Sequence, residues 1–284
     1  MRCTPIVTLV LLFSFAACGS GGGGTSGTPD DGGTVDDASP DLEPDLEPDL
    51  QPDPEPDSGP AIDAIPDTAP EATEELPPAV PLAGFGVITG DCGVLDDDEW
   101  LSADPFLFRN EVDFGTTAFE ASLLSPAGQE VEKDGNLGGS SIHSESIAVD
   151  LLYRCELANL LKTEREIVYV DKNGKKTDAL VTIDGRKVGV SVVRAFHYPP
   201  TDPCTAADAD KLMIKKLGDI PLSAANAADE DAWERSVLHV IAYNDQCADT
   251  FAAAWESLDF SVRASTIVVI TTTEGKDDFI YTNN

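Results

Sequence analysis

Basic residues are scarce in this chain of 284 amino acids, in which 18 lysines and arginines stand against 52 aspartates and glutamates. The formal net charge is −34 at pH 7. Because phosphate backbones are bound by positive surface, this balance disfavours nucleic acid as a partner without excluding it. Twelve of the basic residues lie between Arg154 and Lys216, so the acidic charge is locally relieved in that segment.

The chain also lacks an apolar run long enough to cross a bilayer. The run near the N-terminus, Ile6–Phe15, has about ten residues, where a membrane-spanning helix needs about twenty. A short apolar run behind a basic Arg2 is typical of the core of a signal peptide.

The end of this run and the residues after it, Phe15-Ala-Ala-Cys18, resemble a bacterial lipobox, in which leucine is usual where Phe15 stands. The resemblance implies that residues 1–17 are a signal peptide and that Cys18 becomes a lipidated N-terminus held in the membrane. The alternative is an ordinary secretory signal cleaved near Ala17. Because Gly19 replaces the aspartate associated with inner-membrane retention, the resemblance implies an exported envelope protein, on the outer rather than the inner membrane.

The sequence also has few histidines, and its cysteines are not spaced as metal-binding pairs. The three histidines are scattered, and the cysteine spacings match no zinc motif. Beyond the signal peptide and Cys18, an even number of cysteines remains, which indicates disulfides in an oxidising compartment. Three pairings are possible, and we expect the pairs Cys92–Cys155 and Cys204–Cys247.

Residues 18–80 are predicted to be a disordered tether. The segment opens rich in glycine and serine and continues as a proline and acid repeat, PDLEPDLEPDLQPDPEPD, from Pro40 to Asp57. It holds 17 acidic residues after Cys18 and no lysine or arginine, so it repels itself and cannot build a core. A charged spacer is favoured over a calcium-binding segment, because no ligand geometry is implied.

Residues 81–284 are predicted to form one α/β domain, a mixed central sheet flanked by helices. Residues 81–140 are expected to be an irregular lead-in, in which Asp96, Asp97 and Asp98 form a solvated turn rather than a metal site. The remaining core, 141–275, is predicted in the order helix, three strands, helix, strand, helix, strand. The expected ranges are 141–156, 162–171, 178–183, 187–195, 205–217, 236–243, 248–258 and 265–272.

This order resembles the core of the PD-(D/E)XK, or restriction-endonuclease-like, nuclease superfamily. The resemblance places the family's helix glutamate at Glu145 and its strand aspartate at Asp178, as ligands of Mg²⁺, which prefers oxygen. The acid and lysine of the family's third strand fall on Ser191 and Val193, so the chain departs from the pattern there. Some nucleases of this type take the lysine from the next helix, which here implies Lys211 and Lys215, a pair spaced to share one helix face.

Three hypotheses follow. The first is a lipid-anchored envelope protein whose degenerate nuclease-like domain serves binding or structure. The second is a Mg²⁺-dependent extracytoplasmic nuclease that uses Glu145, Asp178 and a relocated lysine. The third is an envelope lipoprotein with an unrelated α/β fold, whose partner is unknown beyond the membrane that Cys18 reaches.

Overall fold

The computed structural model describes residues 78–199 and 202–282, which belong to one compact unit. Seven strands form a single mixed sheet in the order β1-β2-β7-β6-β5-β4-β3. The strands are β1 (Val87–Gly90), β2 (Phe106–Asp113), β3 (Asn159–Thr163), β4 (Ala179–Ile183), β5 (Arg186–Ala195), β6 (Arg235–Ala242) and β7 (Ile267–Glu274). The four central strands β2, β7, β6 and β5 are parallel, and the antiparallel strands lie at the two sides.

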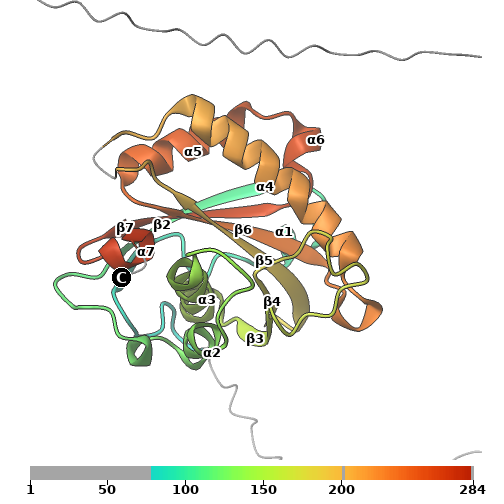
Figure 1. The fold of residues 1–284 in the computed structure, drawn as a ribbon, viewed down its shortest axis with the longest axis horizontal. Helices are drawn as coiled ribbons and strands as arrows, with labels where there is room; N and C mark the ends of the chain where they lie inside the picture. Colours follow the sequence, from blue (N-terminus) through green and yellow to red (C-terminus); the bar gives the residue numbers. More distant parts are fainter. Residues whose placement is uncertain (1–77, 200–201, 283–284) are drawn as a thin grey trace, which may run out of the picture. The chain divides into compact units, whose positions relative to one another are not determined.

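Helices cover both faces of the sheet, so the expected class, α/β with a mixed sheet flanked by helices, is confirmed. The pair α2 (Pro126–Asp134) and α3 (Ile142–Glu156) packs on one face, and α4 (Ala206–Asn226) and α5 (Asp245–Ser257) pack on the other (Figure 1). The shorter helices are α1 (Asp97–Leu101), α6 (Phe260–Arg263) and α7 (Asp278–Thr282).

Each face carries its own apolar layer, because β5 to β7 alternate their buried side chains between the two faces. Under α3, Ile147 and Leu151 pack with Val190 and Val192 of β5. Under α4 and α5, buried leucine, methionine and aromatic side chains pack with Val193, the next residue of the same strand. Strands buried on both faces need continuous apolar runs, which is why β6 and β7 are recognisable in the sequence.

The first strand of the core differs from the range 162–171. It is β3, residues Asn159–Thr163, which pairs antiparallel with β4. The chain turns immediately after it, because the N–H groups of Glu166 and Ile167 donate to the carbonyl of Thr163, and the Glu166 carboxylate accepts from the Thr163 N–H. The residues from 164 to 178 therefore form a long connection rather than one arm of a tight hairpin.

The segment 81–140 is more regular than the expected lead-in. Its strand β2 pairs in parallel with β7 along its whole length, from Phe106 opposite Ile267 to Asp113 opposite Glu274. The sequence PFLFRNEVD has no clean alternation, because β2 is only partly buried and mixes aromatic with charged side chains. The acidic run nearby belongs to α1, where Asp96 caps the helix by accepting from the Asp98 N–H.

Both expected disulfides are confirmed, Cys92–Cys155 and Cys204–Cys247. The first joins the segment after β1 to the end of α3, and the second joins the segment just before α4 to the first turn of α5. The expected signal peptide 1–17, the expected lipidation site Cys18 and the predicted tether up to residue 77 lie outside the described residues. Within the described part of the chain, we find no helix with the length and apolarity that crossing a membrane requires.

Candidate functional site

The candidate site lies where β4 leaves β5. The two strands pair up to Ala179 opposite Val190, and the Asp178 N–H still donates to the Val190 carbonyl. From Ser191 onward, β5 has β6 as its strand partner on one side, which leaves its other edge open within the described residues. At this open edge, the backbone N–H and carbonyl of Val192 both bond to side chains instead of to a neighbouring strand.

The N–H of Val192 donates to an Asp178 carboxylate oxygen at 2.6 Å, and its carbonyl accepts from the Lys216 ammonium at 2.9 Å. Asp178 arrives from the start of β4 and Lys216 from α4. An acid and a lysine from two different elements are thus held at the backbone of one residue, Val192, because a strand edge presents unpaired N–H and C=O groups.

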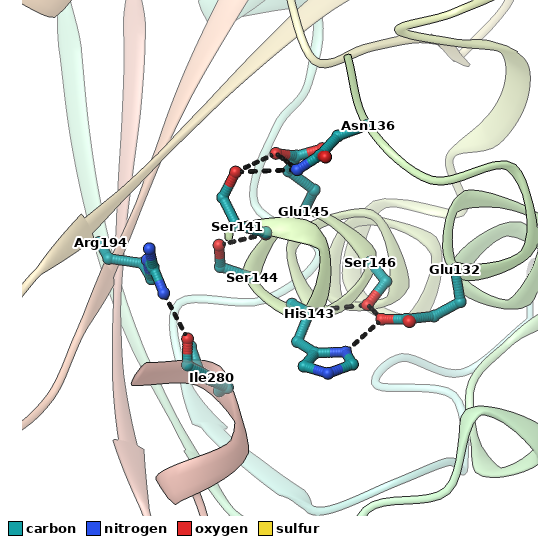
Figure 2. Close-up of polar contacts among 9 residues, drawn as sticks. All are labelled: Glu132, Asn136, Ser141, His143, Ser144, Glu145, Ser146, Arg194 and Ile280. Carbon is teal, nitrogen blue, oxygen red and sulfur yellow. Dashed lines mark hydrogen bonds and ion pairs between the residues drawn. The ribbon is translucent and has the colours of Figure 1, made fainter. Parts of the chain in front are cut away.

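Glu145 stands in the first turn of α3, near the same edge. Its carboxylate accepts from the Ser141 hydroxyl at 2.6 Å and from the Asn136 amide at 3.2 Å, as Figure 2 shows. The side chain is buried, which raises its pKa, while these two hydrogen bonds act in the opposite direction.

The carboxyl groups of Glu145 and Asp178 affect each other electrostatically. Burial raises the pKa of Asp178 to about 7; the Lys216 charge opposes this rise, and the Glu145 carboxylate adds to it. Lys216 likewise opposes the rise in the pKa of Glu145. Two acids with raised pKa values and a lysine acting on both are a combination that occurs often at functional sites and also in structural ion networks.

The two lysines expected from the sequence lie elsewhere on α4. Lys211 and Lys215 are exposed, whereas Lys216 is half-buried. A signal for Lys216 was present in the sequence, since it falls beside Met213 and Leu217 on the stripe that α4 buries. A lysine on a buried stripe needs a polar partner, and here the Val192 carbonyl supplies one.

The two positions that stand for the family's third-strand pair are both buried. The Ser191 hydroxyl lies 3.3 Å from the Thr177 hydroxyl and is 7% exposed. Val193 packs into the apolar layer under α4 and α5. Neither side chain offers an acid or a lysine at the open edge of β5.

Arg194 is the basic residue of β5 nearest in sequence to this edge. Its guanidinium donates to the Ile280 carbonyl of α7 at 2.9 Å, as Figure 2 shows. Burial lowers the pKa of Arg194, and the charges of Tyr281 and Glu145 oppose this fall. Sequence reasoning missed Arg194 because it assigned the third-strand pair to Ser191 and Val193. Val192 and Arg194 lie on the opposite face of the sheet from that pair.

The donor chemistry fits Mg²⁺ only in part. Glu145 and Asp178 supply the oxygen ligands that this ion prefers. However, no group of three histidine, cysteine, aspartate or glutamate side chains is placed to hold a metal ion among residues 78–199 and 202–282. Because the donor set is incomplete, we derive no reaction step through a metal.

Comparison with known proteins assigns no family to this chain. No protein-family model matches it, and no solved structure matches it. The chain is 32% identical over 154 residues to the AAC-rich mRNA clone AAC4 protein of Dictyostelium discoideum. The match covers 52% of this chain and 22% of that protein, so the chain spans about a fifth of the length of the relative, whose name states no activity.

Proposed function

We propose that this protein is an exported, lipid-anchored envelope protein whose domain has a nuclease-like core and binds a partner rather than cleaving one. The observation that carries the binding role is that β5 brings no carboxylate to this edge on either face, since Val192 packs in the apolar layer under α3 and Val193 in the layer under α4 and α5. A valine at this place can neither polarise a scissile phosphate nor activate water, and Ser191 brings no carboxylate.

The nuclease-like core is supported by the run of elements from α3 to β7. Apart from the short α6, the order is helix, three strands, helix, strand, helix and strand. The first three strands form an antiparallel meander, and α4 then connects β5 to the parallel strand β6. Glu145 and Asp178 approach one edge of this meander, which favours the nuclease-like core over an unrelated α/β fold.

The anchor is tested by labelling. Cells that make the full chain are fed radioactive palmitate, and we expect the label on the wild-type protein and none on Cys18→Ser. A Cys3→Ser variant is the matched control and should keep its label, because Cys3 lies within the expected signal peptide. Equal labelling of all three proteins would refute lipidation at Cys18.

A second function, a Mg²⁺-dependent nuclease, is favoured by one observation, the charge of Lys216 acting on both carboxyl groups. In this alternative Lys216 takes the place of the missing third-strand lysine, and Glu145 and Asp178 provide the oxygen ligands. The metal would supply Lewis-acid polarisation of the phosphate and a more acidic water.

One assay separates the two functions. The full chain is incubated with single-stranded DNA, double-stranded DNA and RNA, with Mg²⁺ or Mn²⁺, beside Asp178→Asn and Lys216→Met. The binding proposal expects no cleavage above that of either variant. Metal-dependent cleavage by the wild-type chain that both variants lose would refute the binding proposal and establish the nuclease.

A further inference from the structure

The exposed side of α4 carries lysines interleaved with aliphatic residues. Lys211, Ile214, Lys215 and Leu222 lie within one face of this helix, given its 100° turn per residue, while Met213 and Leu217 are buried on the other side. Ile214 and Leu222 are 50% and 56% exposed. At 1.5 Å per residue, this face extends over about 16 Å between Lys211 and Leu222.

The connection between β3 and β4 lies alongside this face and continues it. The backbone N–H of Val170 donates to the Asn226 carbonyl at the end of α4, and Lys175 pairs with Asp219 of α4 at 2.9 Å. On this connection Val170 is 77% exposed, and Lys172 is exposed as well. We call the six residues Val170, Lys172, Lys211, Ile214, Lys215 and Leu222 the lysine ridge.

The charge of the ridge differs from that of the rest of the domain. Its three lysines are exposed. The nearby acids are Asp171, Asp208, Asp210 and Asp219; Asp219 is paired with Lys175, and Asp208 accepts from the Thr205 hydroxyl. The domain as a whole has 35 acidic residues against 17 basic ones. An anionic partner is therefore repelled by most of the molecule and attracted at this ridge, which orients the molecule towards that partner.

We propose that the lysine ridge docks on a membrane surface rich in anionic lipid headgroups. Lysines with aliphatic side chains between them match such a surface, because the ammonium groups are attracted to the anionic headgroups and the aliphatic ends are buried at the acyl boundary. Single-stranded nucleic acid fits less well, because its bases stack on aromatic side chains and the ridge has none. The inference rests in part on the proposed envelope location, which brings the domain near a bilayer.

The test uses the full chain with Cys18→Ser, so that no lipid anchor contributes. Its co-sedimentation is measured with vesicles of phosphatidylglycerol and phosphatidylcholine, and with vesicles of phosphatidylcholine alone. We expect binding only to the anionic vesicles. The variant Lys211→Glu/Lys215→Glu should weaken this binding by a factor of at least about 30, given the contribution of each lysine near an anionic surface.

A matched variant, Lys133→Glu/Lys276→Glu, makes the same charge change at exposed lysines outside the ridge and should bind nearly as the parent does. Ile214→Ser/Leu222→Ser should weaken binding without altering its salt dependence. All four positions on α4 are exposed, and thermal melts check that each variant is folded. Palmitate labelling reports on the anchor separately, so failure of the ridge and failure of the anchor are distinguishable.

Three outcomes would overturn the proposal. The first is no binding of the Cys18→Ser chain to anionic vesicles. The second is an equal loss of binding in the matched variant, which would make net charge rather than the ridge responsible. The third is binding to DNA or RNA that depends on Lys211 and Lys215 while vesicles are not bound.

Discussion

Replacement of Asp178 by asparagine should stabilise the protein at alkaline pH. The pKa of this carboxyl rises from 3.8 to about 7 on folding, chiefly through burial. This rise is about three units, and each unit corresponds to about 1.4 kcal/mol, so ionised Asp178 destabilises the folded state by up to about 4 kcal/mol. Because the residue is half-buried, solvent screening reduces the expected effect to on the order of 2–4 kcal/mol.

The sign follows from proton binding. Below about pH 4 the carboxyl is protonated in both the folded and the unfolded chain, and Asp178 imposes no penalty. Between about pH 4 and pH 7 the unfolded chain loses its proton first, so the free energy of unfolding falls as the pH rises. Above about pH 7 the penalty is complete and constant.

Asparagine stays neutral at every pH and keeps an oxygen that can accept from the Val192 N–H. Urea unfolding of wild type and Asp178→Asn at about pH 5 and about pH 8 measures the difference, and the variant should be the more stable at the higher pH. Asp98→Asn, at an exposed position of α1, is the matched control and should leave the pH dependence unchanged. An Asp178→Asn protein that is less stable than wild type at the higher pH would refute this reasoning.

Three other substitutions test parts of the fold and the site. Lys216→Met should raise the pKa of Asp178 further, because the lysine charge now lowers it; carboxyl NMR titration measures this shift, and an unchanged or lower pKa would contradict it. Cys92→Ser/Cys155→Ser should reduce the free energy of unfolding by about 2–5 kcal/mol, because it opens a loop between cysteines 63 residues apart; urea midpoints of the variant and of wild type, both under oxidising conditions, measure this loss, and equal midpoints would contradict it. Gly189→Ala should cost about 1–3 kcal/mol, since a Cβ there would lie 2.4 Å from the Trp233 ring; equal thermal stability of Gly189→Ala and wild type would show that the ring moves freely.

The parts of the fold that were predictable from the sequence are those with strong local signals. The stripe of α3, the alternation of β4 and the apolar runs of β6 and β7 each determine an element without help from distant residues. By contrast, β3 and β2 depend on their partners. The strand β3 ends where the Glu166 carboxylate binds the Thr163 N–H, and the partly buried β2 is positioned by its parallel pairing with β7.

The acids of the candidate site were indicated by the nuclease resemblance, and the place of Lys216 on the buried stripe of α4 was visible in the sequence, but the partner of this lysine was not. The resemblance places Glu145 and Asp178 at the start of a helix and of a strand, as the nuclease pattern has its two acids. Lys216 requires knowledge that β4 leaves β5 before Val192, because only then is the Val192 carbonyl open to a lysine from α4. Pairing between strands is non-local, so no window of sequence around Lys216 contains that information.

Which residues of β5 face the candidate site can be tested with Val193→Lys, which introduces the lysine that the nuclease resemblance expects at this position. Val193 is 8% exposed and packs in the apolar layer under α4 and α5, so a lysine there is buried without a counter-charge. We expect a loss of on the order of 3 kcal/mol in the free energy of unfolding, measured by urea unfolding. Val170→Lys, at an exposed valine, is the matched control and should change stability by less than about 0.5 kcal/mol. If Val193→Lys is as stable as its control and acquires Mg²⁺-dependent nuclease activity, then β5 still presents this position to the site. The burial of Val193 could then no longer support a binding role.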